Sequence, residues 1–148
     1  MFKGAARKEK GRTMHRLLLP SFLLLLAASA PPATAQGDLA RYRDKNRLLL
    51  VFAPSASDPR WAHQDALLAG SRAQFADREL LRFNVFEHGA GAAGLRARYH
   101  VHPGSFRVLL IGKDGHVASS DTAPVALADL TSRIDRMPMR RDEMRRRG

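Results

Sequence analysis

A run of six consecutive apolar residues, Leu48 to Ala53, sets the architecture that this chain can adopt. A strand with one face in water alternates apolar and polar residues, so an unbroken short run indicates a strand that is covered on both faces. Central strands of α/β sheets are of this kind, and they present functional groups at their C-terminal ends. Here that end reads Pro54-Ser55-Ala56-Ser57-Asp58-Pro59 and contains no thiol.

The first 35 of the 148 residues have the pattern of a cleaved secretory signal. Six Lys and Arg residues precede a largely apolar segment at 17–30, and Ala33-Thr34-Ala35 supplies the small-x-small cleavage pattern. The apolar segment is short and runs into Pro31-Pro32, so we expect cleavage after Ala35 rather than a transmembrane helix. A start at Met14 would give a shorter signal, and the choice between Met1 and Met14 stays open. The pattern predicts an exported protein, periplasmic or secreted, with no membrane span after cleavage.

Cleavage would leave 113 residues, enough for one domain with a modest core. The net charge falls from +11 for the whole chain to +6 for residues 36–148, and much of the excess lies in arginines near the C-terminus. The chain contains no cysteine. Disulfides and thiol chemistry are therefore excluded, stability must come from packing, and we expect no cofactor.

A long helix is predicted after the apolar strand, from about Pro59 to Ala76. Apolar residues that recur every seven positions would form one stripe along it, namely Trp61, Leu68 and Phe75. Ser57 or Asp58 can cap the free backbone N–H groups at its start, and proline fits the first helical position.

The other predicted elements complete an α/β pattern. They are a strand at 80–86, a short helix near 92–99, a strand at 106–112, a strand at 116–120 and a helix at about 125–136. The first two strands should be parallel because a helix joins them, and Lys113-Asp114-Gly115 should turn an antiparallel hairpin. The order β-α-β-α-β-β-α is thioredoxin-like, with a four-stranded mixed sheet in the order 2-1-3-4 flanked by helices. This domain would span residues 36–138, and residues 139–148 would form a flexible basic tail.

Three separated segments also carry a resemblance to a known family: "RLLLVFAPSASDPR", "FRVLLIGKDG" and "IDRMPMRRDEMR". Over roughly residues 38–145 they resemble the bacterial domain of unknown function 4174 family. That domain is similar to repeats in vertebrate matrix proteins such as coiled-coil domain-containing protein 80 and the sushi-repeat proteins. The resemblance implies a thioredoxin-like fold and export, and it implies no established activity.

The chain departs from true thioredoxins where their chemistry resides. Their paired cysteines would fall at residues 55–60, which read Ser-Ala-Ser-Asp-Pro-Arg, and the proline before their third strand has its nearest counterpart in Pro103. Both parts of a dithiol site are missing. The sequence therefore excludes disulfide exchange.

Ser55, Ser57, Asp58 and Arg60 form the first candidate site, at the junction of strand and helix. They could hold an anion or a substrate carboxylate at the helix N-terminus, with Arg60 adding charge. They could equally be plain helix-capping residues, which we favour because Asp58 would repel an anion. The alternative is a non-thiol enzyme that uses this cluster of four residues, with or without a histidine, although no GxSxG motif is present.

His100 and His102 form the second candidate site. The two residues bracket Val101, so both imidazoles would point the same way in an extended segment and, with His63, His88 or His116, could bind zinc or copper. No HExxH-like spacing or acidic cluster supports this reading. Exposed loop histidines without a metal are the simpler interpretation.

The C-terminal arginines are the third candidate site, for a polyanion: Arg140, Arg141, Arg145, Arg146 and Arg147. An anionic membrane surface or cell-wall polymer would suit an exported protein, whereas nucleic acid is not an expected partner and the tail has no aromatic stacking residues. Met137, Met139 and Met144 interleave with the arginines at spacings that a short amphipathic helix could use. A solvated end without a partner is the competing interpretation. The main hypothesis is thus an exported, redox-inactive binding module that meets an anionic envelope component or a protein.

Overall fold

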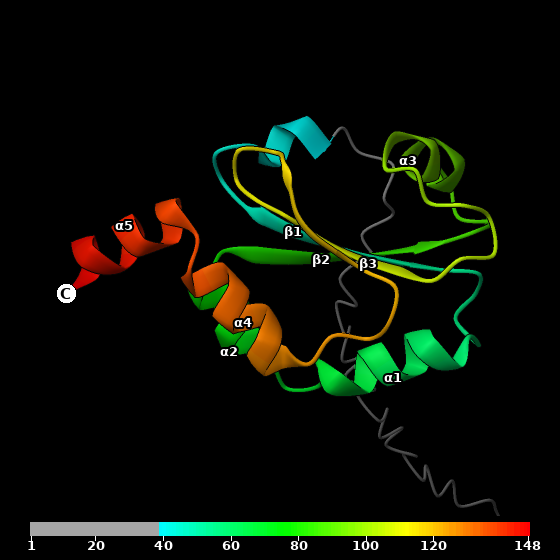
Figure 1. Cartoon of the computed structure of the whole chain (residues 1–148), viewed down its shortest axis with the longest axis horizontal. Helices are drawn as coiled ribbons and strands as arrows, with labels where there is room; N and C mark the ends of the chain where they lie inside the picture. The colour runs from blue at the N-terminus through cyan, green and yellow to red at the C-terminus, as the bar shows by residue number, and fades with distance from the viewer. Residues whose placement is uncertain (1–38) are drawn as a thin grey trace, which may run out of the picture. The chain divides into compact units, whose positions relative to one another are not determined.

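The computed structural model describes residues 39–148 (Figure 1). The elements in chain order are the 3-10 helix η1 Leu39–Tyr42, β1 Arg47–Ala53, α1 Pro59–Leu67, α2 Arg72–Asp77, β2 Leu80–Phe86, α3 Ala92–Arg98, β3 Arg107–Ile111, β4 Val117–Asp121, α4 Leu127–Asp135 and α5 Pro138–Arg147. The predicted signal and its cleavage site lie outside the described residues.

The strands form one mixed sheet in the order β2-β1-β3-β4. β1 is parallel to β2 and antiparallel to β3, so Leu50 lies between Phe83 and Leu109. β3 and β4 form the predicted antiparallel hairpin, in which Gly115 has a φ of +82°. Strand order and directions confirm the sequence-based prediction, and the fold is thioredoxin-like α/β.

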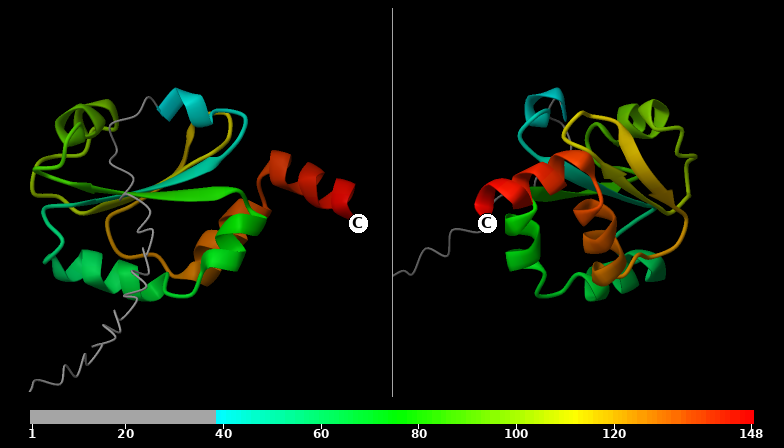
Figure 2. Two further views of the ribbon diagram at one scale, coloured as in Figure 1. Left: turned by 180° about the vertical axis from the view of Figure 1, so that it is seen from behind. Right: turned by 60° about the vertical axis from the view of Figure 1, so that its left-hand side comes forward.

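β1 is covered on both faces, as its apolar run indicated. All seven of its residues are buried, and successive side chains enter two different cores. Leu48, Leu50 and Phe52 face the core under η1 and α3. Leu49, Val51 and Ala53 face the other core, which α1, α2 and α4 cover (Figures 1 and 2).

The predicted helix at 59–76 is two helices, which corrects the sequence-based expectation. α1 ends at Leu67 and α2 begins at Arg72, and between them Gly70 has a φ of +73°. A left-handed residue cannot continue a right-handed helix, so the chain changes direction there. The stripe of Trp61, Leu68 and Phe75 nevertheless packs against one core on both sides of the break.

The flexible tail predicted after Pro138 is instead the helix α5 (Figure 2). Pro138 occupies one of its first positions, as is common at helix starts. Its one buried residue is Arg140, which is 4% exposed, and Met139 and Met144 are 42% and 40% exposed. α5 therefore has no apolar face against the domain, and charged side chains must hold it.

Candidate functional site

Asp58 at the start of α1 is a helix cap. One carboxylate oxygen, Oδ1, accepts the backbone N–H of Arg60 at 2.8 Å and its Nε at 3.0 Å, and Oδ2 accepts Nη2 at 2.7 Å. The side-chain hydrogen bonds from Arg60 lower the pKa of Asp58 below its ordinary value. Asp58 and Arg60 thus form an ion pair, and Asp58 has the helix-capping role that we favoured from the sequence.

The two serines of the same junction bond to each other. The hydroxyl oxygens of Ser55 and Ser57 lie 2.8 Å apart. Within residues 39–148, neither hydroxyl is hydrogen-bonded to a histidine or to a carboxylate. An activated serine needs a base within hydrogen-bond reach, and the geometry here offers none.

His100 and His102 lie in the loop between α3 and β3. Both are exposed, and His100 adopts a left-handed φ of +53°. Together with Glu87 they line an open pocket of about 420 Å³ beside α3. No group of three or more His, Cys, Asp or Glu side chains in the described part of the chain is placed to hold a metal ion. The two histidines are thus without a third protein ligand there.

Arg96 of α3 lies behind this loop and was not among the predicted site residues. It is 5% exposed, and its guanidinium donates to the carbonyl oxygens of Ala53 at 3.0 Å, His102 at 2.9 Å and Ser105 at 3.2 Å. Burial lowers the pKa of Arg96, although the nearby Glu87 opposes this shift. The side chain joins the end of β1 to the loop that precedes β3.

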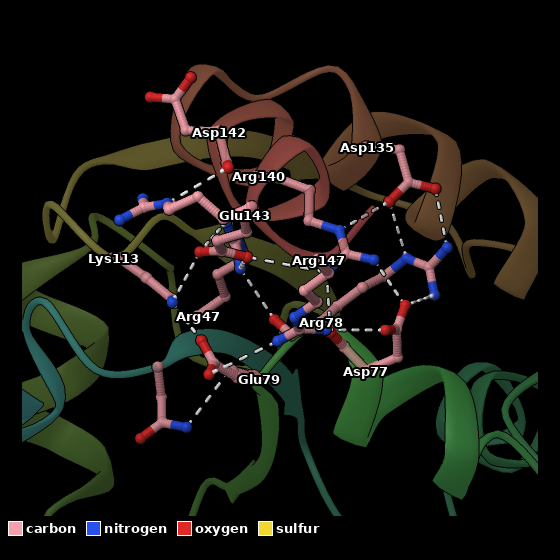
Figure 3. A network of polar contacts seen from close by, with 12 residues as sticks. Arg47, Asp77, Arg78, Glu79, Lys113, Asp135, Arg140, Asp142, Glu143 and Arg147 are labelled. Carbon is pink, nitrogen blue, oxygen red and sulfur yellow. Dashed lines mark hydrogen bonds and ion pairs between the residues drawn. The ribbon is translucent and has the colours of Figure 1, made fainter.

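A second cluster of charges lies at the opposite end of β1, where α5 meets the sheet (Figure 3). Arg47, 1% exposed, presents both Nη atoms to Glu143 at 3.1 and 3.2 Å. Lys113, 8% exposed, contacts the same Glu143 at 2.7 Å and also pairs with Glu79. Two buried cations therefore share one carboxylate delivered by α5.

The rest of the cluster joins α5 to α2 and α4. Arg140 contacts Asp77 at 2.5 Å and Asp135 at 3.3 Å, and Asp135 also accepts Arg78 Nη2 at 2.7 Å. At the end of α5, Arg147 contacts Asp77 at 3.0 Å (Figure 3). The inward side of α5 is thus held by ion pairs that reach three other elements.

Two carboxylates of this network, those of Glu143 and Asp135, are held in their charged form. Burial by itself would raise the pKa of Glu143, but the hydrogen bonds and charges of Lys113 and Arg47 outweigh it and lower the pKa to about 2. The pKa of Asp135 is lowered in the same way, against burial, by Arg78 and Arg140. Glu143 and Asp135 therefore carry their negative charge at neutral pH.

The predicted polyanion-binding residues separate into two groups on α5. Arg140 is buried and Arg147, half exposed, is paired, so both take part in holding the helix. Arg141, Arg145 and Arg146 are exposed, and the only carboxylate that contacts any of them in the described chain is Asp142. The interleaved methionines do not form a common face, because Met137 packs on the core while Met139 and Met144 are exposed.

Residues 38–143 match the family of the Domain of unknown function (DUF4174). The chain belongs to this family. The match covers the whole sheet, both cores and the first half of α5. The DUF4174 domain described here is free of cysteine.

Two proteins are similar to this chain. Coiled-coil domain-containing protein 80 of Danio rerio is 29% identical over 142 aligned residues, which cover 76% of this chain and 16% of that protein. The chain thus spans a small part of that relative's length. Among solved structures, one described as a malarial protein matches with a TM-score of 0.49 and 13% identity, over 61% of this chain and 94% of that one.

The residues that sequence reasoning missed are buried charges. Arg96 follows the apolar positions of its helix, since Ala92, Leu95 and Tyr99 share its face, and this spacing was a usable signal. Arg47 stands directly before the apolar run, which also favours burial. Lys113 and Glu143 carried no such signal.

Between positions 39 and 148, no helix is long and apolar enough to cross a membrane.

Proposed function

We propose that this DUF4174 domain is an exported, non-catalytic module that binds an anionic envelope polymer through the outer side of α5. The supporting observation is the division of α5. Its inward charges form ion pairs with the rest of the domain, and its outward arginines, Arg141, Arg145 and Arg146, are exposed. A docked helix presents these charges at fixed spacing, which lowers the ordering entropy lost on binding.

Export is proposed on the pattern of residues 1–35. A basic segment, an apolar segment and a small-x-small motif occur there in the order of a secretory signal. Expression in a bacterial host with an intact export pathway, followed by intact-mass measurement, tests it. We expect a protein that begins at Gln36 in the extracytoplasmic fraction. An uncleaved chain in the cytoplasm would refute export.

The absence of catalysis is proposed on the state of the strand-end residues. Asp58 and Arg60 neutralise each other, and Ser55 and Ser57 share a hydrogen bond. The chain has no cysteine and therefore no thiol, and within residues 39–148 no base is hydrogen-bonded to either of these two serine hydroxyls. Turnover of an oxidised, ester or phosphorylated substrate by the purified protein would contradict this part of the proposal.

Binding is tested by retention of the exported protein on an immobilised polyanion, eluted with a salt gradient. A triple variant, Arg141→Gln, Arg145→Gln and Arg146→Gln, should elute at distinctly lower salt, because each lost charge weakens a screened attraction.

The matched control removes three exposed arginines from other elements that form no salt bridge within residues 39–148: Arg41→Gln, Arg72→Gln and Arg98→Gln. Both variants have the same net charge. If the two variants elute alike, binding follows total charge and α5 is not the site.

A further inference from the structure

A small pocket of about 70 Å³ is lined by residues of η1, β1, α3 and the β3–β4 hairpin, on the side of the sheet that η1 and α3 cover (Figure 1). Its interior is apolar, because Leu39, Leu48 and Ile111 line it and all three are buried. One buried water needs about 10–15 Å³ on the same measure, and a site for a drug-sized ligand has roughly 300–1,000 Å³. The pocket therefore admits a group of a few heavy atoms.

The charge in the lining is entirely positive. Arg43 and Arg98 are its charged side chains, and no carboxylate is among the lining residues. Within residues 39–148, neither arginine forms a salt bridge. Asp44 and Asp114 belong to neighbouring turns, but both are exposed, and Asp114 contacts His116 through both carboxylate oxygens. An anion in this pocket would thus meet two cations that the domain leaves unpaired.

Both guanidinium groups are held in place by neutral contacts. The Nε of Arg43 donates to the carbonyl oxygen of Asp114 at 3.0 Å, and its Nη2 lies against the backbone of Gly115. The guanidinium of Arg98 lies over the ring of Tyr99, 5.5 Å from its centroid. In the described part of the chain, the Nη groups of Arg43 and all donors of Arg98 are without a hydrogen-bond partner. These donors are therefore positioned and free, which reduces the entropy lost when an anion binds.

The phenol of Tyr99 adds a third donor to the lining. The side chain is half-buried, and its hydroxyl makes no hydrogen bond to any residue between 39 and 148. Burial raises the pKa of Tyr99, although the charge of Arg98 opposes this shift. The hydroxyl consequently keeps its proton at neutral pH and can donate it to an oxyanion.

We propose that this pocket binds a short-chain aliphatic monocarboxylate. The carboxylate meets the forked donors of Arg43 and Arg98, and the apolar group covers the three interior side chains. An inorganic anion would lose hydration against those apolar walls, and a neutral molecule would leave both arginines without a counter-charge. A long chain exceeds the volume of about 70 Å³. The site is separate from the outward arginines of α5 and does not depend on the polyanion proposal.

The experiment is a two-dimensional NMR titration of the purified, isotopically labelled protein with acetate, butyrate, octanoate, 1-butanol and phosphate. The amides of Gly112 and Gly115, which line the pocket, should shift and saturate with butyrate. Butyrate should bind more tightly than acetate, by up to about fourfold for each of the two added methylenes. 1-Butanol should bind at least about tenfold more weakly, because it lacks the charge that meets both arginines. Octanoate should stay within about threefold of butyrate, because its further methylenes remain in water.

Several results would each overturn the proposal. They are butyrate shifts that do not saturate or that lie away from the pocket, equal affinities for acetate and butyrate, and equal affinities for butyrate and 1-butanol. Tighter binding of phosphate than of butyrate would show that the apolar interior plays no part. Binding of octanoate more than about tenfold tighter than butyrate would show that the ligand extends beyond this pocket.

Two exposed arginines provide a matched pair of variants. Arg98→Gln should weaken butyrate binding by about threefold to fivefold, as expected for one exposed ion pair. Arg72→Gln on α2 removes the same charge from a residue outside the lining that forms no salt bridge within the described chain, and it should leave binding unchanged. Arg43→Gln and Tyr99→Phe should also weaken butyrate binding. Equal effects of Arg98→Gln and Arg72→Gln would mean that net charge, and not the pocket, holds the ligand.

The triple glutamine variant of α5 separates this pocket from the polyanion surface. It keeps every residue of the lining, so butyrate should bind it as tightly as it binds the unaltered protein. Loss of butyrate binding in that variant would refute the assignment to this pocket. Arg98→Gln in turn keeps the outward arginines of α5, so the two proposals can fail independently.

Discussion

Asp58 stands directly before helix α1, where an aspartate is a favoured capping residue. The sequence left an enzymatic role open, and the structure shows the carboxylate bonded to Arg60 and to the start of α1. A cap contributes to stability and needs no ligand. The contacts of Asp58 are therefore those of a helix cap.

Asp58→Ala should lower the free energy of unfolding by about 1 kcal/mol, because the N–H of Arg60 loses its acceptor. Urea unfolding followed by circular dichroism measures it. Asp58→Ser is the control, since a hydroxyl can still cap and the loss should be smaller. Equal losses in both variants would show that the ion pair with Arg60, and not the cap, is the main contribution.

Arg96 is a second single residue that contributes to stability, because its guanidinium donates hydrogen bonds to backbone carbonyl oxygens. Arg96→Met would remove this donor from the carbonyl oxygens of Ala53 and Ser105, and each buried group left unsatisfied costs about 1–3 kcal/mol. The carbonyl oxygen of His102 also loses it but keeps the N–H of Ser105. We expect a loss of at least about 2 kcal/mol in urea unfolding. Arg98→Met on the exposed side of the same helix should change stability by less than about 0.5 kcal/mol. Similar losses from both would show that the three carbonyl contacts contribute little.

At the scale of elements, the break between α1 and α2 is the main departure from the expected pattern. A seven-residue apolar period is compatible with one helix or with two helices that pack on the same core. The period could not reveal the break, because it records only which residues are buried. The helix is interrupted at Gly70, because this residue has a positive φ.

Two glycine substitutions test the break directly. A Cβ at Gly70 or at Gly94 would meet no atom within 4 Å, so only the backbone conformation differs between the two sites. Gly70→Ala should destabilise the protein by about 1 kcal/mol, because its φ is +73°. Gly94→Ala, within α3, should stabilise it by about 0.5–1 kcal/mol. If thermal unfolding showed that both alanines stabilise, a continuous helix through residue 70 would be correct.

At the scale of the whole molecule, α5 is attached by charge rather than by an apolar face. The ion pairs of Glu143 connect it to the first strand and to the hairpin, and those of Arg140 connect it to α2 and α4. Removing one partner of a buried pair leaves the other uncompensated, which is strongly destabilising. Docking of α5 and stability of the domain should therefore respond together to pH.

The pKa of Glu143 determines in which direction stability changes with pH. Its pKa is lowered from 4.5 to about 2 in the folded protein, so its contribution is fully present above about pH 4.5 and is lost as the pH falls toward 2. The shift corresponds to roughly 3 kcal/mol. The stability difference between the unaltered protein and Glu143→Gln should fall by roughly half between pH 5 and pH 3, in urea unfolding at each pH.

A difference that stays constant over this range would contradict the predicted pH dependence. Hydrogen exchange of the α5 amides provides an independent readout, since Glu143→Gln should speed their exchange at neutral pH. Asp142→Asn is the control on the same helix, because within residues 39–148 the carboxylate of Asp142 pairs only with the exposed Arg145. It should leave both readouts nearly unchanged.

The sequence was sufficient for the elements whose conformation depends on near neighbours. β1 followed from its own apolar run, the hairpin from Gly115 and the start of α1 from Asp58, and the order of these elements led to the sheet. The tertiary structure alone decided the state of the charges. Arg47 and Glu143 stand 96 positions apart, and Arg140 and Asp77 stand 63 apart. A charged side chain is exposed or buried according to whether a partner reaches it, and that depends on how distant segments meet. An arginine-rich end consequently reads as a free tail in the sequence and is a docked helix in the fold.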